Sequence, residues 1–550
     1  MAVPALRPAV RRTEWPRVSL PSLLIAAAVL GAAANVAVTL VRLPALLAAT
    51  YRFSDAPALA FYADALLNGH GPLALPTQTS VGVLWLDELI TPFPVHHLIE
   101  YITGPAITLI AFALIVRSAQ LVGGRRLAAA TVLALALLPP IFLWPLLFPD
   151  NHATTVLGMA VLLWHSARDT AGRHSNARSV AVGLATGLLL VTDPQLVVAG
   201  AIPYLVTQIV MALRLRARAA MRPALLTVVA ASVAVAMTVS AMRAQGLHII
   251  ALVPGGDIVS NLAHGTVLSL QTAGWSINGG WYGSDFSVSS LALLPVAAAI
   301  GVALMRVVAK TVTTWRRRET ASMVEGYRLY WLLSMLCVAG AFAVLGYGLT
   351  SLQGHYLLPV FFAAAALLPT AILEERHHSR GTKPGAPRRV TMLASLVVAI
   401  LGAHTAYATA TVDAANFDAG LAPSASADPL PLLLEHGLSR GYSGYWEAFD
   451  LDWRGDGKVA VWPVLGGPAA CGAAAGSVCA YGFAPEGVYR PVSGRTFIIT
   501  PASNEACVAP QPSVSIFGVP AAAYRTGPYI ISMYEYDVAS RFSTATQLFC

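Results

Sequence analysis

The chain has 550 residues, enough for several soluble domains, but 56% of them are hydrophobic and only 11% are charged. A mean hydropathy of +0.64 excludes an ordinary soluble protein, so most of the chain must lie in lipid. The Lys and Arg residues that give the net charge of +8 lie mainly in loops between apolar segments. This distribution indicates membrane topology and not nucleic-acid binding.

The first long apolar run, residues 19–41, follows an arginine-rich tail at 1–18 and is too long for the h-region of a cleaved signal peptide. We therefore predict a retained span. Ten further apolar runs cover residues 99–121, 127–148, 153–167, 179–192, 196–213, 224–244, 287–309, 328–349, 356–373 and 391–411. The sequence thus predicts a polytopic α-helical membrane protein with about eleven spans over residues 19–411.

Basic residues indicate the orientation. Most of the 35 Lys and Arg residues fall in the N-terminal tail and in every second loop, whereas the other loops before residue 412 hold only Arg42, Arg52 and Arg243. Since cytoplasmic loops accumulate Lys and Arg, the N-terminus is predicted to be cytoplasmic. The segment after the last span is then extracytoplasmic.

Three predicted outer segments are long enough to fold: residues 50–98, 245–286 and everything after 411. The first contains Leu59, Tyr62, Ala63 and Leu66 at helical spacing, which predicts a short amphipathic helix in the membrane interface. Residues 412–431 have the composition of a linker. Residues 432–550, with β-prone stretches at 459–464, 496–500, 514–519 and 529–534, predict a small α/β or mostly β domain.

Cysteine usage agrees with this topology. Cys337 lies inside a predicted span, whereas Cys471, Cys479, Cys507 and Cys550 all follow the last one, where an oxidising compartment is expected. Two disulfides could form, and Cys471 with Cys479 is the local option. The pairing cannot be read from the sequence, and some of these thiols could stay free.

The sequence contains no compact soluble-enzyme motif, so any chemistry must come from polar groups at the outer ends of spans. Asp55 follows the first span, although Ser54 or Asp55 could simply cap a helix. Asp150 and His152 lie in a turn between the third and fourth spans, where turn formers are also expected on structural grounds.

Asp193, followed by Pro194 and Gln195, joins the fifth and sixth spans, and helix capping explains it. His355 and Tyr356 open the tenth span from outside, as a ligand contact or an interfacial aromatic anchor.

A metal site is not predicted, because no histidine pair was found at helical ligand spacing with a nearby Cys or Glu. No cofactor is established from the sequence, although a divalent cation could take part. Trp275, Trp281 and Tyr282 in the 245–286 loop could stack on sugar rings or anchor the loop to the membrane.

Taken together, these features resemble the GT-C superfamily of polytopic glycosyltransferases, which includes protein mannosyltransferases and lipid A aminoarabinose transferases. Asp55, with the helix behind it, matches the early outer-loop Asp of that superfamily, and Asp150 matches its second outer acid. The segment from His355 to Pro359 resembles an Arg-Tyr-Leu-x-Pro element, with His in place of Arg. The stretch at 441–446 resembles the C-terminal part of uncharacterised bacterial members, which implies a bacterial cytoplasmic (inner) membrane.

The resemblance implies transfer of a sugar from a polyprenyl-phosphate-linked donor to a hydroxyl of a lipid or glycan acceptor outside, with inversion. Asp55 would be the general base. Arg52, His152 or His355 would stabilise the departing phosphate, Tyr356 would contact donor or acceptor, and Asp150 would orient the acceptor or a cation.

Two alternatives have no catalytic role. The first is a transporter or flippase, which usually shows internal repeats and ionisable residues at mid-membrane, and neither was found. The second is a glycan-binding membrane protein that uses residues 432–550.

Overall fold

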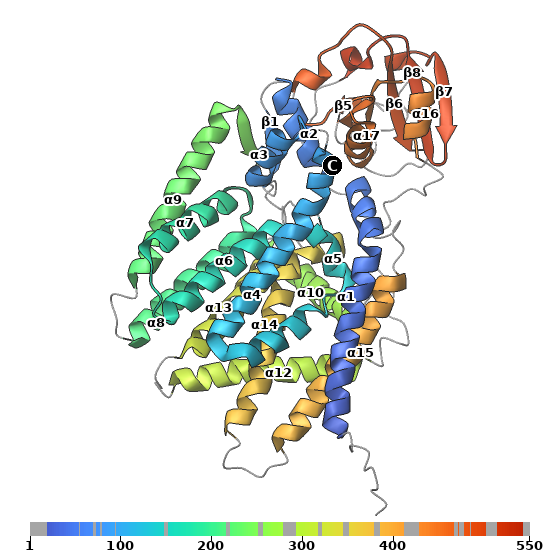
Figure 1. Cartoon of the computed structure of the whole chain (residues 1–550). Helices are drawn as coiled ribbons and strands as arrows, with labels where there is room; N and C mark the ends of the chain where they lie inside the picture. The colour runs from blue at the N-terminus through green and yellow to red at the C-terminus, as the bar shows by residue number, and fades with distance from the viewer. Residues whose placement is uncertain are drawn as a thin grey trace, which may run out of the picture.

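The structure is a computed structural model that describes residues 19–53, 56–69, 73–76, 80–93, 95–147, 152–215, 221–250, 257–278, 293–316, 322–344, 351–378, 386–411, 428–466, 471, 478–484, 486–501 and 514–542. It consists of a long helical bundle with a smaller domain that contains a sheet at one end (Figure 1). We call this end of the bundle the domain end.

All eleven apolar runs predicted to span the membrane overlap helices, as expected where lipid leaves only internal partners for backbone groups. Among the described residues, eight helices are long and apolar enough to cross a membrane, or nine if the bent pair α5 and α6 is one span. The chain is a multi-pass membrane protein, and the count of eleven stays a prediction. The bundle helices are α1 (Leu20–Phe53), α4 (His96–Leu135), α5 (Pro140–Leu147), α6 (His152–Thr170), α7 (Asn176–Thr192), α8 (Ile202–Leu215), α9 (Met221–Ala244), α10 (Ile258–Asn278), α12 (Leu294–Arg316), α13 (Met323–Val344), α14 (Leu358–His378) and α15 (Ala386–Thr411).

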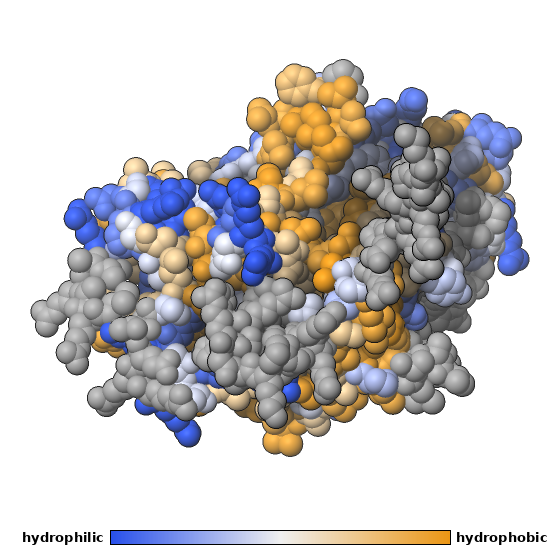
Figure 2. All heavy atoms as spheres, turned by 60° about the horizontal axis from the view of Figure 1, so that its bottom comes forward, coloured by the Kyte–Doolittle hydropathy of each residue, from blue (hydrophilic) through white to orange (hydrophobic). Residues whose placement is uncertain are grey.

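The bundle surface is apolar, which suits contact with lipid. Val41 of α1 is 82% exposed and Leu213 of α8 is 73% exposed. Figure 2 shows broad hydrophobic areas on the face seen from the lower end of the bundle. Exposed apolar patches of this extent are rare on soluble proteins.

The first and last spans, α1 and α15, pack along each other (Figure 1). A Cβ on Gly31 would lie 3.0 Å from the carbonyl oxygen of Ala399, and one on Gly402 would lie 2.5 Å from the backbone of Gly31. Small residues let membrane helices approach this closely. Thr409 adds a hydrogen bond to Asn35, 3.3 Å long, across the same contact.

At the domain end, α2 (Ala56–Leu67) and α3 (Val81–Ile90) lie beside a two-stranded parallel sheet of β1 (Leu73–Pro76) and β2 (Leu247–Ile250). The amphipathic helix expected near residue 59 is α2. Its apolar side chains Leu59, Tyr62 and Ala63 are at most 1% exposed, because they share one core cluster with α3, β2 and the C-terminal domain. The predicted location of this helix in the membrane interface stays a prediction.

The predicted outer loop 245–286 contains a further helix, α10, packed on α13. A Cβ on Gly265 of α10 would lie 2.7 Å from the Cα of Ala343, so the two backbones almost touch. Trp275 is 4% exposed within the bundle core, which contradicts its expected role in sugar stacking or surface anchoring. Trp281 and Tyr282 lie outside the described residues.

The C-terminal domain is of the α/β type, one of the two classes predicted. Its mixed six-stranded sheet has the order β5-β4-β3-β6-β8-β7, with β3 parallel to both neighbours. In central β6, Phe497 and Ile499 enter one core cluster and Ile498 enters another, as strand alternation requires. The elements are α16 (Leu430–Glu435), β3 (Arg440–Ser443), α17 (Tyr445–Gly455), β4 (Ala460–Gly466), β5 (Val478–Ala480), β6 (Thr496–Pro501), α19 (Val514–Phe517), β7 (Ala522–Thr526) and β8 (Tyr529–Tyr534).

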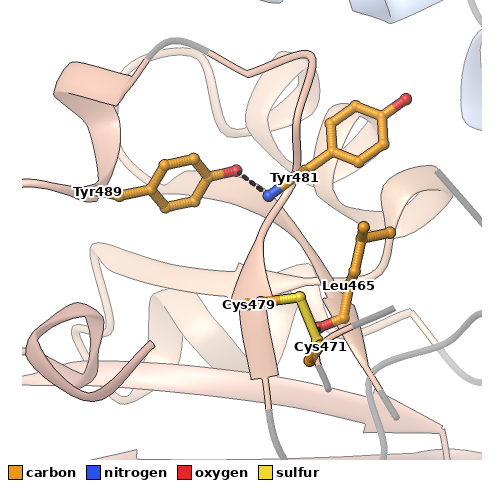
Figure 3. Close-up of a disulfide and its surroundings, with 5 residues drawn as sticks. All are labelled: Leu465, Cys471, Cys479, Tyr481 and Tyr489. Carbon is orange, nitrogen blue, oxygen red and sulfur yellow. Dashed lines mark hydrogen bonds between the residues drawn. A yellow bond between two sulfur atoms is a disulfide. The ribbon is translucent and has the colours of Figure 1, made fainter. Parts of the chain in front are cut away.

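A disulfide joins Cys471 to Cys479 in this domain (Figure 3). This is the local pairing that the sequence had left open, and Cys507 and Cys550 lie outside the described residues. Tyr481 donates its backbone N–H to the hydroxyl of Tyr489 over 3.1 Å beside the disulfide. Both cysteines are buried in the cluster that also contains the apolar face of α2.

Candidate functional site at the domain end

Three predicted ligand-binding residues come together in the structure. His152 begins α6, and its ring centroid lies 4.6 Å from that of His355 and 5.3 Å from that of Tyr356. His355 and Tyr356 belong to the short helix η3 (Ser351–Leu357), which leads into α14. The sequence suggested each residue separately, but their meeting across about 200 positions depends on how α6 packs against α13 and α14.

The His152 side chain is suited to binding a ligand. It is 1% exposed and interacts with the Gln195 side chain, but neither ring nitrogen makes a well-formed hydrogen bond to a residue that the structure describes. A buried polar atom without a partner costs free energy, so a ligand that supplied one would be favoured. A phosphate oxygen, which accepts hydrogen bonds, is one such partner.

The turn between α7 and α8 holds this group in place. Gln195 donates its side-chain amide to the carbonyl oxygen of Tyr356 over 2.6 Å. Asp193 in turn accepts a hydrogen bond of 2.9 Å from the backbone N–H of Gln195, which confirms its predicted capping role. The link from this turn to Tyr356 was not anticipated from the sequence.

Burial raises the pKa of Asp193 to about 7, although backbone N–H groups of Gln195 and Leu196 act in the opposite sense. Its second carboxylate oxygen makes no hydrogen bond to any described residue. Asp193 can therefore hold or release a proton near neutral pH, next to the turn that positions Tyr356.

The remaining predicted site residues are not placed in detail. Asp55 and Asp150 lie outside the described residues, and Arg52 lies in the last turn of α1 without a described side chain. Position 55 directly precedes α2, which begins at Ala56. The roles predicted for these three residues stay predictions.

The C-terminal domain packs on α2, next to position 55. Phe449 of α17 lies 4.9 Å from Phe61 and 5.9 Å from Tyr62, measured between ring centroids. No sequence signal identifies Phe449 as the partner of a helix nearly 400 residues earlier. The contact shows that the soluble domain and the first loop after α1 form one packed unit.

A second polar group at the domain end was missed. His96, His97 and Glu100 lie in the first turns of α4, and one possible ligand atom from each lies within 4.8 Å of the others. The sequence argument overlooked that Glu100 follows His97 by three residues, a spacing that places both side chains on one face of a helix.

No family model matches this sequence, and no curated protein does. Among solved structures, the chain resembles ArnT from Cupriavidus metallidurans bound to undecaprenyl phosphate, with 14% identity over 91% of this chain and 97% of that one, and a TM-score of 0.52. An oligosaccharyltransferase from Archaeoglobus fulgidus is 12% identical over 80% of this chain and 63% of that one, with a TM-score of 0.42, too low to support an argument. At such identities, similarity shows the fold alone. The chain therefore has the fold of ArnT, the GT-C fold that the resemblance in its sequence implied.

Proposed function

We propose that this protein is a membrane glycosyltransferase that moves a sugar from a polyprenyl-phosphate-linked donor to a hydroxyl of a lipid or glycan acceptor. The observation that carries the proposal is the similarity to ArnT over almost the full length of both chains, since that protein was solved with undecaprenyl phosphate bound. The grouping of His152, His355 and Tyr356 supports it, because imidazole and phenol groups can donate to phosphate oxygens.

In the proposed reaction, an acceptor oxygen forms a bond to the anomeric carbon while the bond from that carbon to the phosphate oxygen breaks. Asp55 takes the acceptor proton as general base, and attack from the face opposite the phosphate inverts the configuration. The leaving lipid phosphate gains negative charge, which Arg52, His152 or His355 stabilises. Tyr356 contacts donor or acceptor, and Asp150 orients the acceptor or a cation.

The proposed setting is the bacterial cytoplasmic membrane, with the N-terminus inside and residues 432–550 outside. The distribution of basic loop residues supports this orientation. The disulfide between Cys471 and Cys479 supports it too, because such bonds persist in oxidising compartments. The lipid tail of the donor would stay in the bilayer, beside the apolar surface of the bundle.

The test is transfer of radiolabelled sugar from a panel of polyprenyl-phosphate donors in membranes that contain wild type or Asp55→Asn, at matched protein levels. The matched control is Asp64→Asn, which removes an exposed carboxylate from α2. We expect Asp55→Asn to abolish transfer and Asp64→Asn to retain it. Equal transfer by wild type and Asp55→Asn would remove Asp55 from the mechanism.

No transfer by the wild type across the panel would favour one of the non-catalytic alternatives. Binding of isolated glycan by the full chain would then separate a glycan-binding protein from a transporter or flippase.

A further inference from the structure

The cluster of His96, His97 and Glu100 has the donor set of a transition-metal site. The two imidazole rings lie side by side, with centroids 4.0 Å apart, and one ligand atom from each of the three residues lies within 4.8 Å of the others. Two imidazoles and a carboxylate suit zinc, whereas magnesium and calcium prefer oxygen ligands.

In its neutral form, His96 is held in a tautomer that leaves the Nε2 lone pair to a metal. Its Nδ1 lies 2.8 Å from the carbonyl oxygen of Phe93. A carbonyl oxygen only accepts hydrogen bonds, so Nδ1 must carry the hydrogen and Nε2 keeps its lone pair. A metal-bound histidine usually donates its other ring N–H to such a partner.

His97 also has one ring nitrogen near a possible metal and the other near a hydrogen-bond acceptor, which here is a carboxylate. Its Nδ1 lies 3.4 Å from Oε2 of Glu100, close to the roughly 3.4 Å between two ligand atoms bound to one tetrahedral zinc. Its Nε2 lies 3.6 Å from Oδ1 of Asp456, which follows α17. With Nδ1 bound to the metal, the N–H at Nε2 faces the Asp456 carboxylate.

Glu100 is 2% exposed, and its Oε2 accepts a hydrogen bond of 2.6 Å from the indole N–H of Trp453 in α17. An anionic carboxylate is costly to bury unless a cation compensates its charge. Trp453 and Asp456 both come from the C-terminal domain, so the surroundings of the three ligands are complete only when that domain contacts α4.

We propose that His96, His97 and Glu100 bind a divalent transition metal of the zinc class, and that the bound metal clamps the C-terminal domain to α4 through Trp453 and Asp456. The competing explanation is a metal-free clamp in which a protonated His97 lies between Glu100 and Asp456. The two explanations differ in their response to chelators.

The experiment uses the full chain purified in detergent, stripped of metal with a chelator, dialysed and titrated with Zn²⁺ or Co²⁺. We expect about one metal per chain by elemental analysis, and a visible absorption band from bound Co²⁺. His96→Ala and Glu100→Gln should abolish stoichiometric binding. Asp456→Asn should weaken binding by about 10–100-fold, as loss of the carboxylate that faces a metal-bound histidine does. The control His264→Ala removes a histidine on α10 and should bind like wild type.

Thermal unfolding provides a second measurement, which does not depend on binding assays with variants that fold poorly. Zn²⁺ should raise the thermal unfolding midpoint of stripped wild type and of His264→Ala, and it should leave that of His96→Ala unchanged. Absence of stoichiometric binding by wild type, or unchanged binding by His96→Ala and Glu100→Gln, would overturn the proposal. A midpoint that falls in His97→Ala but does not change when chelator is added to the wild type would assign the metal-free clamp instead. None of these measurements depends on glycosyl transfer.

Discussion

Phe449 lies at the centre of the contact between the C-terminal domain and α2, so its replacement by alanine tests whether this contact holds α2. The ring is 1% exposed and lies 4.9 Å from the Phe61 ring and 4.7 Å from the Tyr445 ring. Loss of a fully buried phenylalanine side chain costs about 3–5 kcal/mol, and aromatic pairs supply about 1 kcal/mol each within that total. We expect most of this free energy to be lost from the contact between α2 and α17.

Hydrogen exchange followed by mass spectrometry on the full chain measures this loss locally. If α2 opens when it leaves α17, a loss of 3–5 kcal/mol raises its exchange rate by at least about 10²-fold. The control Phe449→Leu keeps most of the volume and should cost less than about 1.5 kcal/mol. If α2 of Phe449→Ala exchanged at the wild-type rate and only α17 exchanged faster, the reasoning would be refuted. The bundle alone would then hold α2.

Burial, with Asp64 nearby, raises the pKa of Asp452 from 3.8 to about 7, so the folded chain binds this proton more tightly. Stability should therefore fall as pH rises from about 4 to about 7, and Asp452→Asn should flatten that part of a thermal unfolding profile. Replacement of Cys471 and Cys479 by serine should cost about 2–3 kcal/mol, given their separation of 8 residues, and should make chemical unfolding insensitive to reductant. Under the proposed function, His152→Ala should lower transfer by about 10²-fold, Gln195→Ala by about 3–10-fold and His264→Ala not at all, as measured with labelled donor.

The membrane part of the fold was predictable because its signals are local. Long apolar runs define helices in lipid whatever their neighbours are, and basic loops alternate with them along the chain. The loop expected between the apolar runs 99–121 and 127–148 contains Gly124, whose φ of 73° interrupts the helical path of α4. A left-handed conformation there favours glycine, so the sequence and the backbone agree.

Predictions failed where tertiary packing decides the outcome. Residues 514–517 of the β-prone stretch 514–519 form the helix α19, in which Phe517 is buried and Val514 is exposed, and Val519 beyond the helix is exposed too. Trp275 is of a residue type common in interfacial anchors, but it lies buried in the core of the bundle. Neither result follows from the residues of the segment alone, since each depends on a partner far away in the sequence.

The candidate site also combines residues that the sequence suggested with contacts that depend on tertiary packing. Residue type and position suggested His152, His355 and Tyr356 individually, since each lies at the outer end of a predicted span. Their mutual distances, and the support from Gln195, depend on the packing of three separate helices. The cluster at His96 was visible as a sequence pattern, but its significance comes from Trp453, more than 350 residues later.

The contacts of α17 indicate that the C-terminal domain is part of the site region and not an independent attachment. One side of this helix covers α2, which directly follows position 55, and its far end meets the first turns of α4 through Trp453. The two contacts therefore bracket the chain segment between the first two bundle helices. Removal of the domain would expose the apolar face of α2 and leave the buried Glu100 carboxylate without its indole donor. Both effects raise the free energy of the membrane part alone, so the two parts stabilise each other and position the same loop.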